Sequence, residues 1–136
     1  MPAMGTGMQN SDGTVSDQLY HYHRVRAAGG TGMITVEIVA VHPTSQGGLA
    51  IFDDKFIPGL KRLVDVIHQG GAKACVQLWH AGRQTNSSVT GMPIIAPSAL
   101  PCPLCQEEPQ VMDKALIQEL IESYGDGAYR AKQAGF

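Results

Sequence analysis

The side chains with the most distinctive chemistry follow a short apolar segment in the middle of the chain. The segment runs from Lys73 to Leu78 and carries Gln77 near its end, and His80 and Arg83 come shortly after it. A side-chain amide offers both a donor and an acceptor, which matches the N–H and C=O edge of a flat heterocycle such as a flavin pyrimidine ring. The alternative is that Gln77 bonds loop backbone, and the residue types alone leave both possibilities open.

Two closely spaced cysteines, Cys102 and Cys105, invite comparison with metal sites. A closed zinc or iron–sulfur site needs about four ligands, and this pair supplies only two, so we expect no metal site. The chain has 3 cysteines in all. This odd number argues against a disulfide scaffold and favours a reducing cytoplasm.

The segments that must position these residues alternate between helix and strand patterns. The apolar run from Met33 to Val41 is typical of a parallel strand buried on both faces. The run from Lys73 to Leu78 predicts a second, short strand. A first helix is expected from an N-cap at Ser16-Asp17 to Ala28, and a second from Asp53-Asp54 to Gly70-Gly71.

A third helix is expected after Asp113, which can cap it. Its buried side is predicted to carry the residues Ile117, Leu120, Ile121, Tyr124, Ala128 and Ala131. Between the second strand and this helix, the stretch from Ala81 to about Pro109 is rich in Pro, Ser and Gly and is expected to be a long loop.

The order of these elements predicts an α/β protein with a parallel sheet and right-handed crossovers, if Met1 to Met4 is the tail of a first strand. Three βα units suit the N-terminal portion of a (β/α)₈ TIM barrel, which takes about 250 residues in full; an open doubly wound sheet fits the pattern too. The chain stops after a helix, where a fourth strand is due, so residues 1–136 are expected to be a single incomplete domain.

Composition narrows the classes of function. The formal net charge of −2 gives no basic excess that would indicate nucleic-acid binding. No apolar run reaches the roughly 18–20 residues that span a bilayer, and the first residues lack the pattern of a signal peptide. We therefore expect a cytoplasmic protein that binds neither nucleic acid nor membrane.

In parallel sheets and barrels, ligands bind at the carboxyl ends of the strands. Three segments qualify: Ala3-Met4-Gly5-Thr6, Glu37-Ile38, and Gln77 to His80. If the fold prediction holds, these segments lie close together on one side of the sheet.

A series of motifs resembles the old yellow enzyme family of NADH:flavin oxidoreductases, in the branch of 2,4-dienoyl-CoA reductase and related NADH oxidases. The matching strings are PAMGT (Pro2 to Thr6), RAAGGTGMITVE (Arg26 to Glu37), DDKFIPGLKRL (Asp53 to Leu63), QLWHAGRQ (Gln77 to Gln84), IIAPSALPCP (Ile94 to Pro103) and RAKQAGF (Arg130 to Phe136). They cover essentially the whole chain, and QLWHAGR after a strand is the most specific of them.

The resemblance implies an FMN cradle at the barrel mouth. Ala3, Met4, Gly5 and Thr6 would pass under the isoalloxazine ring, mainly through backbone groups. Ile38 would contact the flavin through its backbone, and Gln77 would bond the pyrimidine edge. Gly5 departs from the pattern, because related enzymes carry Thr or Cys there, so any tuning of the flavin by that side chain is absent.

The resemblance also implies an activity. NAD(P)H would reduce FMN, and the reduced flavin would pass hydride to a small enone or enoyl substrate in a full-length protein that is expected to be a homo-oligomer. The substrate-binding His pair, or His/Asn pair, is expected beyond Phe136, as is the iron–sulfur cluster that relatives carry. Residues 1–136 alone are accordingly expected to be inactive and poorly stable; the alternative function is a structural or association module.

The other polar residues receive structural roles. We expect His80 to hold the loop after the second strand, ahead of any role as an acid. Arg83 has three possible roles, pairing with a phosphate, pairing with a loop carboxylate, or supporting the loop structurally. The remaining histidines are expected to be solvated or structural: His21, His23, His42 and His68.

Overall fold

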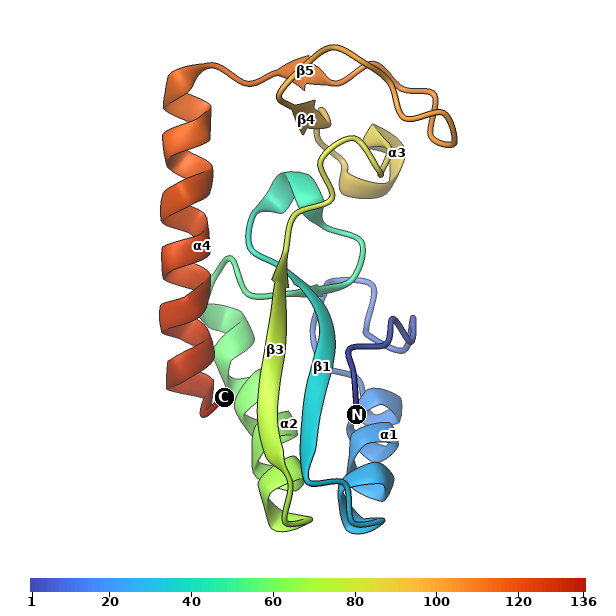
Figure 1. Ribbon diagram of the computed structural model, residues 1–136, viewed down its shortest axis with the longest axis vertical. Coiled ribbons are helices and arrows are strands. Elements are labelled where there is room, and N and C mark those ends of the chain that lie inside the picture. Colours follow the sequence, from blue (N-terminus) through green and yellow to red (C-terminus); the bar gives the residue numbers. More distant parts are fainter.

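A computed structural model describes residues 1–136, and its centre is a parallel sheet in the order β2-β1-β3. The strands are β1 (Met33–Ala40), β2 (Leu49–Ala50) and β3 (Lys73–Trp79). In Figure 1, β1 and β3 run side by side with their carboxyl ends pointing toward the long loop that follows β3. The two strands predicted from the apolar runs are therefore confirmed, and they are parallel.

The N-terminal residues extend along the free edge of β1. The backbone N–H of Thr35 donates to the carbonyl of Met1 at 3.0 Å, and the terminal ammonium of Met1 donates to the Met33 carbonyl at 2.7 Å. Only Met1 makes such bonds, so the predicted strand tail from Met1 to Met4 lies beside β1 without forming a regular strand.

The helices begin where polar side chains cap them. In α1 (Asp17–Ala28), the Ser16 side chain accepts from the N–H of Leu19, and in α4 (Lys114–Ala134), Asp113 accepts from the N–H of Leu116. The predicted second helix starts as the short 3₁₀ turn η2 (Asp54–Phe56), capped by Asp53, before α2 (Ile57–Gln69).

The core lies between one face of the sheet and the helices α1 and α2. Apolar residues alternate along β1, and Ile34, Val36 and Val39 are completely buried. The two helices approach so closely that a Cβ atom on Gly70 would lie 2.7 Å from the carbonyl carbon of Ala27. Burial of these side chains is the main source of stability in this part of the molecule.

β1 contains a bulge next to Glu37. Its pairing with β3 joins Val36 to Val76 and then Ile38 to Gln77, so Glu37 is an extra residue without a partner on β3. Bulges of this kind bend a strand and redirect a side chain, and they are common beside functional sites.

The predicted buried side of α4 is wrong in most positions. Ile117, Ile121 and Tyr124 are exposed by 42%, 60% and 39%, and Ala128 is exposed too. The residues that α4 buries are the small ones, Gly127, Ala131 and Ala134. Helical spacing identified an apolar stripe correctly, but the stripe has no packing partner in residues 1–136.

The stretch predicted to be one loop contains two short elements, and a third follows it directly. They are α3 (Ser87–Thr90) and the paired strands β4 (Ile95–Ala96) and β5 (Gln110–Val111). Figure 1 shows them beyond the carboxyl ends of β1 and β3. Beneath them, η1 (Pro43–Ser45) follows β1 directly. None of the helices is long and apolar enough to cross a membrane.

Candidate functional site at the strand ends

A small pocket opens at the carboxyl end of β1. Its volume is about 110 Å³, and it is lined by Gly5, Thr6, Gly7, Gln9, Glu37, Ile38, Gly47 and Gly48. Three of the predicted site residues, Gly5, Thr6 and Ile38, therefore meet in one place. Ligand pockets for whole cofactors measure about 300–1,000 Å³, so this pocket can enclose only part of such a ligand.

Gln77 lies next to this pocket because it is the register partner of Ile38. Its side chain is exposed and forms no hydrogen bond with any other group of the chain. The alternative in which Gln77 bonds loop backbone is therefore not realised. The amide is free to meet a ligand at the end of the sheet.

Ala3 and Met4 precede the pocket without lining it. Ala3 is half-buried and the Met4 side chain is 53% exposed. A Cβ atom at Gly5 would meet no atom within 4 Å. The segment thus presents mainly backbone to the open side of the site.

Glu37 is a site residue whose role was not predicted from the sequence. It is only 3% exposed, and its carboxylate accepts a hydrogen bond from the backbone N–H of Thr6. Because the bulge turns this side chain toward the N-terminal segment, the carboxylate fixes the backbone that forms one wall of the pocket. A lone acidic residue inside an apolar strand was the available sequence signal.

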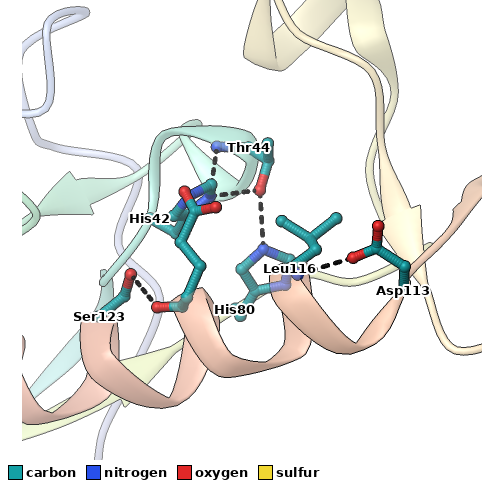
Figure 2. Close-up of polar contacts among 7 residues, drawn as sticks. His42, Thr44, His80, Asp113, Leu116 and Ser123 are labelled. Carbon is teal, nitrogen blue, oxygen red and sulfur yellow. Dashed lines mark hydrogen bonds and ion pairs between the residues drawn. The ribbon is translucent and has the colours of Figure 1, made fainter.

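A chain of polar contacts supports the neighbouring loops, as Figure 2 shows. The Nε2 atom of His80 lies 2.9 Å from the hydroxyl oxygen of Thr44, which lies 2.7 Å from Nδ1 of His42. The Nε2 atom of His42 is 3.1 Å from the carboxylate of Glu119 on α4. The contacts join the loop after β1, the end of β3 and the start of α4.

The protons in this chain have one consistent arrangement. Nδ1 of His80 accepts from the N–H of Gly82 at 3.0 Å, so Nε2 of His80 carries the proton and donates to Thr44. The Thr44 hydroxyl then donates to His42, and His42 donates to Glu119. Burial, and secondarily the nearby His42, lowers the pKa of His80. His80 is thus a neutral support of the loop, in agreement with the structural role predicted for it.

Arg83 also supports the loop. Its Nη1 atom donates to the carbonyls of Leu100 and Pro101 at 2.9 and 3.2 Å. Of the roles considered for Arg83, the structural one matches these contacts, and no loop carboxylate pairs with it.

The remaining histidines differ in their surroundings. His21 and His68 are exposed, whereas His23 is 1% exposed and neither of its ring nitrogens has a hydrogen-bond partner. Burial, with a smaller effect from Arg26, lowers the pKa of His23 to about 4. A neutral, buried His23 belongs to the packing of α1 and lies outside the site.

A larger hollow, of about 510 Å³, is formed entirely by the loop after β3. Its one ionisable group is Glu107, and that carboxylate already accepts from the N–H of Ser87 at 2.9 Å. The smaller pocket at the end of β1 is the better candidate, because it lies at the strand ends and is lined by three of the predicted site residues, Gly5, Thr6 and Ile38.

Comparison with known proteins agrees with this geometry. The model of the NADH:flavin oxidoreductase / NADH oxidase family matches residues 1–136. An NADH oxidase from Thermoanaerobacter brockii is 40% identical over 100% of this chain and 22% of its own length. An NADPH dehydrogenase from Listeria monocytogenes serotype 4a is 41% identical over 95% of this chain and 38% of its own length. The chain thus spans well under half of these relatives.

Solved structures show the same arrangement of helices and strands. The old yellow enzyme homologue from Zymomonas mobilis superimposes with a TM-score of 0.90 at 25% identity, over 98% of this chain and 41% of the homologue. A 2-naphthoyl-CoA reductase in complex with 2-naphthoyl-CoA gives a TM-score of 0.92 at 26% identity, over 99% and 23% of the two chains. The neighbours are TIM-barrel enzymes of the old yellow enzyme type, and the chain belongs to the NADH:flavin oxidoreductase / NADH oxidase family.

Proposed function

We propose that this chain forms part of the FMN site of an NAD(P)H-dependent oxidoreductase. The observation that carries the proposal is the position of Gln77, whose backbone pairs with Ile38, a residue that lines the pocket together with Gly5 and Thr6. When bound, FMN supplies hydride transfer between NAD(P)H and an activated alkene, while the protein holds and tunes it.

Each residue of the site has a distinct binding role in this proposal. The Gln77 amide can donate to the C=O and accept from the N–H of the flavin pyrimidine edge. The backbone from Ala3 to Thr6 would support the ring system, with Glu37 holding Thr6 in place. Ile38 would offer backbone contacts from the neighbouring strand end.

The proposal extends to the complete protein. The pocket of about 110 Å³ encloses only part of a flavin, so we place the remaining walls and the catalytic groups outside residues 1–136. A small enone or enoyl compound is the proposed substrate, by analogy with the 2-naphthoyl-CoA complex. An iron–sulfur cluster, a homo-oligomeric state and a cytoplasmic location stay predictions from the resemblance and the composition.

The test is FMN binding by the full-length protein with Gln77→Ala. Hydrogen bonds of this type contribute about 0.5–1.5 kcal/mol each, so loss of the two expected bonds raises the Kd for FMN about tenfold or shifts its reduction potential. The control is Gln133→Ala, which removes an exposed glutamine on α4.

Unchanged FMN affinity and an unchanged potential in Gln77→Ala would contradict the binding role of Gln77. If the full-length protein itself bound no FMN, the alternative function, a structural or association module, would be favoured instead. In that case the exposed apolar stripe on α4 would be its first candidate surface.

A further inference from the structure

Cys102 and Cys105 lie in one tight turn, Cys102 at its first position and Cys105 at its fourth. The backbone N–H of Gln106 donates to the carbonyl of Cys102 at 2.8 Å and closes the turn. Gln106 ends it with a φ of 57°, the only positive φ of a non-glycine residue in the chain. Residues three apart on a turn lie within about 7 Å between Cα atoms, a range that overlaps the 4.4–6.8 Å, roughly, at which disulfides form.

The two sulfur atoms have different surroundings. The backbone N–H groups of Cys105 and Leu104 lower the pKa of Cys102, with smaller effects from the Cys105 thiol and from Arg83. Burial, followed by the hydrogen bond to Cys102, raises the pKa of Cys105. Such a pairing of a stabilised thiolate with a neighbouring thiol is typical of reactive Cys-X-X-Cys motifs.

The loop after β3 holds this turn from both sides. Arg83 donates to the carbonyls of Leu100 and Pro101, immediately before Cys102. The side-chain amide of Asn86 donates to the carbonyl of Cys105 at 3.0 Å. Both ends of the backbone that carries the two cysteines are therefore anchored.

We propose that Cys102 and Cys105 are a reversible dithiol–disulfide pair that exchanges with low-molecular-weight disulfides. Both thiols are free in the structure, and no set of three or more potential ligand side chains is placed to hold a metal. Cys105 is half-buried and Cys102 is 5% exposed, so the pair lies at the edge of the surface. This inference is independent of the proposed flavin site.

The exchange proceeds in two balanced steps. A thiolate of the pair attacks one sulfur of the external disulfide, which breaks that S–S bond, forms a mixed disulfide and releases one thiolate. The second cysteine gives its proton to solvent and attacks the mixed disulfide, forming the Cys102–Cys105 bond and releasing the second thiolate. Two protein thiols are oxidised, and one external disulfide is reduced to two thiols.

The experiment uses the purified protein, first reduced and then equilibrated in buffers with a rising ratio of oxidised to reduced glutathione. After acid quenching, the remaining thiols are alkylated and the peptides are identified by mass spectrometry. The peptide that carries both cysteines should take up no label and be lighter by two hydrogen atoms, whereas Cys75 stays open to alkylation. Reduced glutathione in excess should reverse the closure.

Single variants and unfolding sharpen the test. Cys105→Ser should accumulate a glutathione adduct on Cys102 at least about tenfold above the wild-type level, because no second thiol removes it. Cys75→Ser should close like the wild type. In the folded protein, Cys102 should be alkylated with a midpoint at lower pH than in urea.

Three results would overturn the proposal. They are stable glutathione adducts in place of closure in the wild type, a bond from either cysteine to Cys75, and closure in the folded protein no faster than in urea at the same pH. The last result would show that the anchored turn contributes nothing to the reactivity of the pair.

Discussion

The sheet is packed tightly against α1 and α2 and loosely against α4. On the side of α1 and α2, large apolar residues are fully buried and the helices meet at Gly70 and Ala27 with almost no space between them. On the side of α4 and β3, the contact is made by small residues, and a groove of about 470 Å³ remains along Ala74, Val76 and Leu78. The packing is therefore denser at the α1–α2 contact than between α4 and β3.

This difference indicates where stability resides. Tightly packed interiors lose stability when even a methyl group is added or removed, whereas a surface open to solvent accommodates changes at little cost. We expect substitutions at the α1–α2 contact to affect unfolding strongly and substitutions on the outer stripe of α4 to affect it weakly.

Gly70→Ala should have the largest effect. The new Cβ would lie 2.7 and 2.9 Å from the backbone of Ala27 and Ala28, which cannot yield as a flexible side chain does. We expect the free energy of unfolding to fall by about 3 kcal/mol, the upper part of the range for overpacking, as measured by urea denaturation. Gly32→Ala is the control, because a Cβ there meets no atom within 4 Å; equal losses in the two variants would contradict the close α1–α2 contact.

His23 should make stability depend on pH. Its pKa is lowered from 6.5 to about 4 in the folded chain, so between these values the unfolded chain binds a proton that the folded chain does not. The contribution of His23 to the free energy of unfolding is therefore fully present above pH 6.5 and should fall by roughly 3 kcal/mol as the pH drops toward 4.

Two variants isolate this contribution of His23. His23→Leu should remove this part of the pH dependence, and His21→Gln, at an exposed position of the same helix, should preserve it. Urea denaturation at a series of pH values measures both. A His23→Leu protein with the wild-type slope between pH 6.5 and 4 would show that another group is responsible.

Two glycines of α4, Gly125 and Gly127, test how closely this helix packs against the sheet. A Cβ at Gly127 would lie 3.0 Å from Cγ1 of Val41, whereas a Cβ at Gly125 meets no atom within 4 Å. Gly125→Ala should stabilise the chain by about 1 kcal/mol through helix propensity, and Gly127→Ala should lose that gain and destabilise the chain by about 1 kcal/mol. Thermal unfolding of both variants checks the difference, and equal shifts in Tm would mean that α4 is not held against the sheet at Gly127.

Ile121→Lys should have the smallest effect on stability. The side chain is 60% exposed, so we expect a change within about 0.5 kcal/mol. The same change should reduce self-association of the isolated chain in sedimentation, because it breaks the apolar stripe. A large loss of stability would show that the stripe is covered after all.

Local features of this chain, and the side of the sheet on which its parallel strands end, could be predicted from the sequence, whereas side-chain contacts between distant segments could not. The caps at Ser16 and Asp113 depend on a few neighbouring residues, and the pairing of Ile38 with Gln77 follows from the rule that parallel strands end on one side. The contact of Glu37 with Thr6 depends on a bulge that no periodicity reveals. Likewise, helical spacing identified the apolar stripe that includes Ile121 but not which elements would cover it.

The bulge at Glu37 changes which residues of β1 face the core. Before it, even-numbered residues such as Ile34 and Val36 point into the core, and after it odd-numbered ones such as Val39 do. If Glu37 were deleted, the remaining residues would alternate without interruption and every pair with β3 would keep its partner. The strand therefore carries Glu37 as a separable insertion: its loss would release the Thr6 backbone and leave the pattern of the sheet intact.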